Sequence, residues 1–363
     1  MAVEPTSLAL LVCDRTGDRS DAAWQKALKP FDRLEFVISD AAKGIASGVQ
    51  AIAAQRAEQT KAEPANGEPP QVVSLEQGLD VFHTAQEAQR VLAGPWRRVE
   101  AAWEEAEAAD ARVIESKRKG QDARAVAPTA RRAWEQATSA LAEVDHQEAA
   151  WQRARAALAI FHPDGRLQDR ANATRTLAVA VTELSGPEWK KVRNFLSDSR
   201  SLSFLDRMHA RLAEAEPDAQ RRQAWVRRWW LRHRQPTTAT LPAPTGPEQV
   251  LAMLDDVIRQ GPLSAEEQAG YDRVAAVLST TVRASSAVEG INSVLRMQQC
   301  RHRQMTQGLL NLKRLYWNCR RLQTGKRRGQ CPYEMLGVAL PTTEFWTLLQ
   351  MSPAHLTQEL STS

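Results

Sequence analysis

The chain lacks the features that mark a secreted, disulfide-bonded or membrane-spanning protein. Its four cysteines, Cys13, Cys300, Cys319 and Cys331, form no Cys-x-x-Cys pair and show no regular spacing. This argues against a zinc cluster and against a disulfide framework. No apolar run reaches the roughly 18 residues of a transmembrane helix, and no basic segment precedes the first apolar run, as it would in a signal peptide. We therefore expect a cytoplasmic protein with no membrane contact.

Acidic residues are almost absent from the late part of the chain. The 46 residues from Arg283 to Arg328 hold eleven lysines and arginines and a single acid, Glu289. Over the whole chain, 48 Lys and Arg stand against 43 Asp and Glu, a net charge of +5. Because the positive charge is concentrated, it predicts a polyanionic partner at one face. Glu289 itself is either a salt-bridge partner or a metal ligand.

The N-terminal part of the chain alternates between strand and helix patterns. Apolar runs predict strands over Ser7–Cys13, Arg33–Asp40 and Gln71–His83. Helical patterns follow each of them, beginning at the N-cap candidates Ser20 and Asp21, at Ala41, and near Thr84. An alternation of this kind predicts an α/β layer with crossover connections.

The middle of the chain is predicted to be all-helical. Apolar residues such as Trp96, Val99 and Trp103 recur at three- and four-residue steps, which is typical of helices packed in a bundle. The chain is then divided as follows: 1–88, the first part of an α/β core; 89–235, an all-α insertion; 236–262, a linker and helix; 263–341, the C-terminal helical part of the core; 342–363, a tail.

Asp40 is the first candidate for chemistry. It ends the second predicted strand and is followed by the small residues Ala41, Ala42 and Gly44. Functional groups in α/β folds gather at the carboxyl ends of strands. The alternative is that Asp40 only caps the following helix.

A second candidate is the polar face of the helix that carries Glu289. Ser285, Glu289, Asn292 and Arg296 follow one another at spacings of four, three and four, so they share one face. A carboxylate, an amide and a guanidinium on one face can hold a divalent cation and a phosphodiester together. The alternative is a solvated face with a weak charge pair.

Four motifs follow one another along the chain in the order FVISDAAKGI, GLDVFH, SSAVEGINSVLR and GKRRGQCPYEMLGV. Together they resemble the DDE transposase family of bacterial insertion sequences, over the stretch up to about Ala88 and from about Leu278 to Pro341, less than half of the chain. The resemblance implies an α/β RNase H-like core interrupted by a large all-α insertion, helix-rich overall. It also implies Mg²⁺- or Mn²⁺-dependent cleavage and strand transfer of DNA through acidic residues.

The resemblance also implies roles for single residues. Asp40 corresponds to the second acid and Glu289 to the third, so both are expected to bind metal. Asn292 and Arg296 are expected to orient Glu289 and to contact the DNA backbone. His83 lies where family members have a histidine near the metal site, although it can also be a packing residue at a strand end. The implied partners are the inverted-repeat ends and target DNA, with a homo-oligomer forming on them. The absence of targeting signals places the expected protein at the nucleoid in the cytoplasm.

The first acid departs from the family pattern. The family has it on an opening strand, whereas only Ser7–Cys13 precedes the first helix here. Asp14 is the doubtful candidate; otherwise the chain is an N-terminally truncated transposase with little activity and an exposed sheet edge. The alternative is that the chain is a non-catalytic helical protein derived from a transposase, with a DNA-binding or regulatory role.

Two basic segments are expected to contact DNA phosphates. Arg227 and Arg228 lie in RRQAWVRRWWLRHR, where arginines can contact phosphates while tryptophans stack on bases. The alternative is that these tryptophans pack inside the bundle. The later basic segment adds four expected phosphate contacts, Arg301, Arg303, Lys313 and Arg314.

Overall fold

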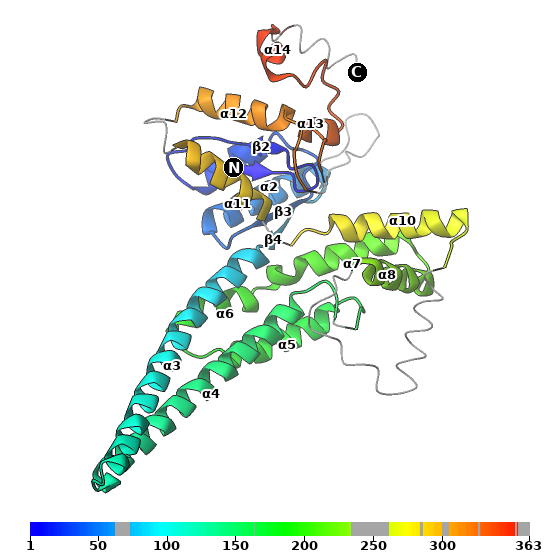
Figure 1. Cartoon of the computed structure of the whole chain (residues 1–363). Helices are drawn as coiled ribbons and strands as arrows, with labels where there is room; N and C mark the ends of the chain where they lie inside the picture. The colour runs from blue at the N-terminus through cyan, green and yellow to red at the C-terminus, as the bar shows by residue number, and fades with distance from the viewer. Residues whose placement is uncertain are drawn as a thin grey trace. The chain divides into compact units, whose positions relative to one another are not determined.

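The computed structural model describes residues 1–61, 73–162, 164–233, 261–283, 286–299, 305–325, 327–352 and 354. The described chain is helix-rich with a few short strands (Figure 1), which confirms that expectation. It forms two compact units: unit 1 comprises Met1–Asp80 and Val282–Ser363, and unit 2 comprises Val81–Thr281. Among the described helices, none combines the length and apolarity needed to cross a membrane.

The strands of unit 1 form two small sheets. β1 (Ala2–Val3) pairs antiparallel with β2 (Leu10–Val12), and β3 (Phe36–Ser39) pairs in parallel with β4 (Glu76–Leu79). The sequence predicted β2, β3 and β4 but not β1, because two residues are too few to show a strand pattern. The third predicted strand was too long at its carboxyl end, because helix geometry begins at Val81.

Two helices cover the parallel pair. α1 (Asp21–Leu28) begins at Ser20, whose side chain accepts a hydrogen bond from the Ala23 amide at 3.3 Å. α2 (Lys43–Lys61) is the crossover from β3 to β4, and α1 packs on it. Gly44 allows this close approach, because a Cβ there would collide with the Arg19 carbonyl oxygen.

The core around α1, α2 and the parallel strand pair is apolar, and the buried arginine Arg56 bonds to backbone carbonyls beside it. Its buried members are Leu28, Ile45, Val49, Ile52 and Leu75. Arg56 is only 8% exposed, and its guanidinium donates to the carbonyl oxygens of Phe31, Leu34 and Val73 at 2.6–3.1 Å. Arg56 therefore ties α2 to the segments that precede β3 and β4.

The C-terminal segment adds four helices to unit 1: α11 (Ser286–Gln299), α12 (Gln307–Cys319), α13 (Pro332–Met335) and α14 (Phe345–Gln350). α11 and α12 lie beside the N-terminal strands in Figure 1, and their residues Ile291, Leu295 and Leu310 share a core cluster with Leu10 and Cys13. α14, which the sequence assigned to a tail, packs on α12.

Side chains of α12 bond to the backbone of the β2 segment. The Asn318 amide accepts from the Leu10 N–H at 2.8 Å and donates to the Leu10 carbonyl at 3.0 Å. Trp317 Nε1 donates to the carbonyl of Leu8, which has a left-handed φ of 62°. Arg314 donates to the Leu11 carbonyl at 3.1 Å. These bonds satisfy backbone groups that we expected an open sheet edge to expose.

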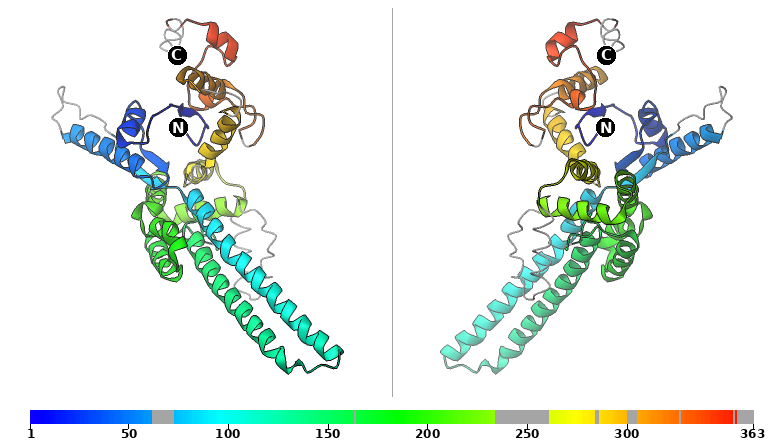
Figure 2. Two further views of the ribbon diagram at one scale, coloured as in Figure 1. Left: turned by 90° about the vertical axis from the view of Figure 1, so that its left-hand side faces the viewer. Right: turned by 90° about the vertical axis from the view of Figure 1, so that its right-hand side faces the viewer.

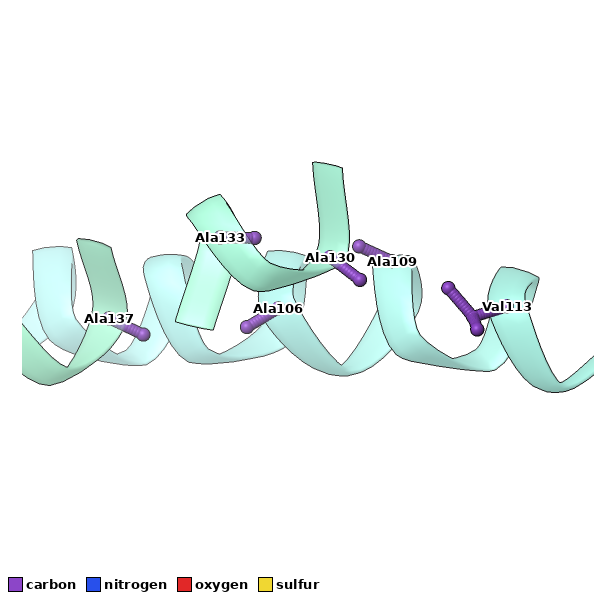
Figure 3. Packing of buried hydrophobic residues seen from close by; sticks show 6 residues of the cluster. All are labelled: Ala106, Ala109, Val113, Ala130, Ala133 and Ala137. Atoms are coloured by element: carbon purple, nitrogen blue, oxygen red, sulfur yellow. The ribbon is translucent and has the colours of Figure 1, made fainter. Parts of the chain in front are cut away.

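Unit 2 is built on a long helical hairpin, α3 (Val81–Arg118) and α4 (Ala127–Ala157), which we call the arm. Figure 2 shows the two helices side by side. The buried residues packed between the two helices, shown in Figure 3, are small: Ala106, Ala109, Val113, Ala130, Ala133 and Ala137. Small side chains let the two backbones approach closely, so the Ala-rich composition is explained by packing.

Where unit 2 is described, its other α-helices are α5 (Arg170–Glu183), α6 (Lys190–Ser197), α7 (Ser203–Ala215), α8 (Ala219–His233) and α10 (Ala265–Thr280). α10 packs on α7 and α8. The units therefore divide at 80/81 and 281/282, whereas the sequence placed the divisions at 88/89 and 262/263. α3 is continuous from Val81, which shifts the first boundary. The predicted linker lies largely outside the described residues.

We predict that Asn318→Ala lowers the free energy of unfolding by about 2–4 kcal/mol, because two buried backbone groups of Leu10 lose their partner. Asn318 is 1% exposed. Urea denaturation measures the change. The control is Asn194→Ala on α6, where the side chain is exposed and the expected change is within about 0.5 kcal/mol. Equal effects of the two substitutions would contradict the role of Asn318.

Candidate metal and nucleic-acid site

Asp40 lies directly after β3 and is exposed to solvent. Its Oδ1 accepts a long hydrogen bond of 3.4 Å from the amide of Ala42, the residue directly before α2. The residue therefore sits at the carboxyl end of a strand, and its bond to Ala42 lies in the turn before α2 rather than in the helix. Because that hydrogen bond is weak, the carboxylate remains accessible to a cation.

Asp80 is a second strand-end carboxylate, and the sequence analysis passed over it. The parallel register pairs Ser39 with Leu79, so Asp40 and Asp80 hold corresponding positions after adjacent strands. The Asp80 amide donates to the Ser39 carbonyl at 2.9 Å, and the residue is 1% exposed. Its position beside Asp40 depends on the register of the two strands, which the sequence does not give.

Glu289 lies in the first turn of α11 and is half-buried. Asn292 is also half-buried and Arg296 is exposed, while Ile291 and Leu295 on the other side enter the core. The helix thus has the polar and apolar faces that its spacing predicted. Ser285, the remaining member of the predicted face, lies outside the described residues.

The described residues do not complete a metal site. Among them, no group of three or more His, Cys, Asp or Glu side chains is placed to hold a metal ion. Asp14, the doubtful first acid, instead accepts a hydrogen bond at 3.2 Å from Gln307 at the start of α12. Asp40 and Glu289 are hard oxygen ligands of the type that Mg²⁺ takes, but they fall short of the donor set of a two-metal site.

His83 belongs to the first turn of α3 in unit 2 rather than to a strand. It is half-buried, and its ring lies 6.0 Å from the Phe82 ring. His83 is therefore not a strand-end residue, and its expected role near a metal stays a prediction.

α8 uses its tryptophans inside unit 2. Trp225 is buried and meets Tyr271 edge-on at 6.4 Å, and Trp229 stacks on Phe161 at 5.6 Å. Arg228 on the same helix is also buried, with 3% of its surface exposed. It donates to the Gly261 carbonyl at 2.8 Å and lies over the Tyr271 ring at 5.7 Å. Burial lowers the pKa of its guanidinium. The expected contact of Arg228 with phosphates is corrected, because the side chain points into the protein.

The other expected DNA contacts differ in how accessible they are. Arg227 donates to the Asp164 carbonyl and lies 4.8 Å from the Trp230 ring. Arg314 is bonded to the β2 segment, as described above. Arg301 and Arg303 lie outside the described residues. The accessible part of the predicted surface is therefore the exposed Arg296 on α11, with the half-buried Lys313 on α12.

The three described cysteines lie inside the protein. Cys13, Cys319 and Cys331 are buried and unpaired with one another by disulfides. Burial, with a smaller contribution from the nearby Cys331, raises the pKa of Cys319 to about 12. A thiol of this kind stays protonated at neutral pH, so it is neither a nucleophile nor a metal ligand.

We expect Arg228→Ala to lower the stability of the protein by about 2 kcal/mol, because a buried hydrogen bond and a cation–π contact are lost. Thermal unfolding measures this loss. Arg296→Ala, on an exposed helix face, should leave the unfolding temperature unchanged. A loss of stability with Arg296→Ala as large as the loss with Arg228→Ala would contradict the described burial of Arg228.

A second prediction concerns Cys319. In the native protein at pH 8, iodoacetamide should leave this thiol unmodified, because its raised pKa keeps the thiolate fraction very small and burial denies access. In urea the same thiol should react fully. Peptide mapping by mass spectrometry distinguishes the two states, and rapid native labelling of Cys319 would refute the described burial.

Comparison with known proteins adds no relative. No protein-family model matches the chain, and neither a curated protein nor a solved structure matches it.

Proposed function

We propose that the protein is a DNA-binding protein of the DDE transposase type from an insertion sequence, with an RNase H-like core in unit 1 and an all-α insertion in unit 2. One observation carries the proposal. Asp40 and Glu289 belong to the same compact unit, although the whole of unit 2 separates them in the sequence. The parallel β3–α2–β4 crossover, with Asp40 at its strand end, adds support.

The nucleic-acid part of the proposal is supported by charge. The segment from Arg283 to Arg328 holds one acid against eleven Lys and Arg, and Arg296 presents its charge to solvent. Cations on an exposed face release counterions from a phosphate backbone, which drives binding without sequence preference. The proposed partners are DNA ends and target DNA, bound by more than one copy of the chain at the cytoplasmic nucleoid.

Mg²⁺ or Mn²⁺ is the proposed cation, with Asp40 and Glu289 as its protein ligands. Such a cation supplies Lewis-acid activation of a phosphodiester. Asp40 is the accessible ligand, and α11 holds Glu289 in its first turn. Since the described residues supply no third ligand, we also propose a non-catalytic, DNA-binding or regulatory role as the second candidate function.

The test separates binding from chemistry. The wild-type protein should bind a short mixed-sequence duplex in EDTA, with affinity falling by orders of magnitude between about 50 and 200 mM salt. Asp40→Asn and Glu289→Gln should weaken Mn²⁺ binding, measured by calorimetry, about tenfold or more and leave DNA affinity in EDTA unchanged. A protein that binds no DNA at low salt would overturn the proposal.

A cleavage assay with Mg²⁺ or Mn²⁺ on the ends of the element decides between the two candidate functions. Absence of cleavage by the chain alone supports the non-catalytic role. Robust cleavage that disappears in both Asp40→Asn and Glu289→Gln supports the enzyme. If Asp14→Ala abolishes it as well, Asp14 is the first acid and its bond to Gln307 must open during the reaction.

A further inference from the structure

Unit 1 contains an apolar groove between α11, α12 and α14, which we call the α12 groove. Its floor includes Leu10, Ile291 and Leu295, and Tyr316 and Phe345 stand at its edge. The cavity measures about 190 Å³, below the range of roughly 300–1,000 Å³ that small-molecule sites occupy. A space of this size suits one large side chain inserted from a macromolecular partner.

The surface around the α12 groove is unusually apolar for an exposed region. Leu312 and Tyr316 on α12 are 43% and 52% exposed, and Trp346 on α14 is 67% exposed. Exposed apolar side chains that gather around a cavity mark an interaction site more often than a free surface. The basic helix α12 therefore presents an apolar ridge as well as its positive charges.

The groove also contains a cation that lacks a counter-charge. Arg320 stacks on the Trp317 ring at 3.7 Å, and its Nε is buried without a hydrogen-bond partner. No carboxylate of the described chain pairs with this guanidinium, and burial lowers its pKa. A half-buried, unpaired guanidinium beside an apolar cavity calls for an occupant that brings a carboxylate together with an apolar anchor.

The arm of unit 2 carries a surface with this composition. Glu100, Trp103, Glu107 and Asp110 of α3 follow one another at spacings of three, four and three, so they share a face. Trp103 is 37% exposed although it meets Trp134 edge-on at 5.1 Å. Among the described residues, Glu100 and Glu107 form no ion pair and are exposed.

We propose that the α12 groove is a self-association site that receives the acidic face of α3 around Trp103 from a second copy of the chain. Trp103 enters the apolar cavity, and Glu100 or Glu107 pairs with Arg320. The contact is heterologous, because two different surfaces meet, so it forms either a closed ring or an open chain of copies. The inference concerns assembly and is independent of the proposed DNA chemistry.

The test uses a fluorescein-labelled peptide of residues 99–111, VEAAWEEAEAADA, titrated with the full-length protein. Fluorescence anisotropy should show saturable binding, weakened about tenfold or more by Arg320→Glu because attraction becomes repulsion. Arg328→Glu is the matched control, since Arg328 is exposed in the following loop and should not affect the peptide. Tyr316→Ala is a second groove variant in case Arg320→Glu fails to fold, which circular dichroism monitors.

A charge swap makes the result decisive. A peptide with Glu100→Lys and Glu107→Lys should bind the Arg320→Glu protein better than the wild-type protein. Sedimentation velocity should show concentration-dependent association of the wild-type chain that Trp103→Ala and Arg320→Glu both reduce. The proposal would be overturned if Arg320→Glu left peptide binding unchanged, or if Trp103→Ala left self-association unchanged. The proposal would also be overturned if substitutions in the groove lowered DNA affinity and left self-association unchanged, because nucleic acid would then be the occupant.

Discussion

The bonds from α12 side chains to the backbone of the β2 segment hold unit 1 together. Asn318, 1% exposed, takes the place of a neighbouring strand by bonding to both the N–H and the carbonyl of Leu10. Without these bonds, the unit would lose the link between its N-terminal strands and its C-terminal helices, which the chain reaches only after passing through unit 2. The position of Glu289 depends on this link, because α11 shares the apolar cluster with Leu10.

Arginine serves three physical roles in this protein. Arg56 and Arg228 are buried and donate to backbone carbonyls, so their charge is dispersed over main-chain dipoles in the interior. Arg296 is exposed and suits a phosphate partner. Arg320 lies between these cases, stacked on an indole and lacking a carboxylate partner among the described residues. The basic composition therefore overstates how much positive charge is available to an anionic partner, since part of it is used in folding.

The candidate site was predictable where a local pattern carried it. Asp40 follows a strand that the sequence recognised, and the face of α11 follows from spacings of three and four residues. Asp80 was missed because its place depends on the parallel register of β3 and β4, which no local pattern reveals. Arg228 was misjudged because a helical wheel of arginine and tryptophan fits both a solvent face and a packed one.

The sequence alone determined the local structure: the three recognised strands, the caps and periodicity of the helices, and the concentration of positive charge around a single acid. The tertiary structure decided which side chains are available. It placed α10 in unit 2, buried Arg228 against Tyr271, and brought Asn318 to Leu10 across more than 300 residues of chain. The physical reason is that burial and long-range hydrogen bonding arise from packing between elements, whereas helix and strand periodicity is encoded within a few neighbouring residues.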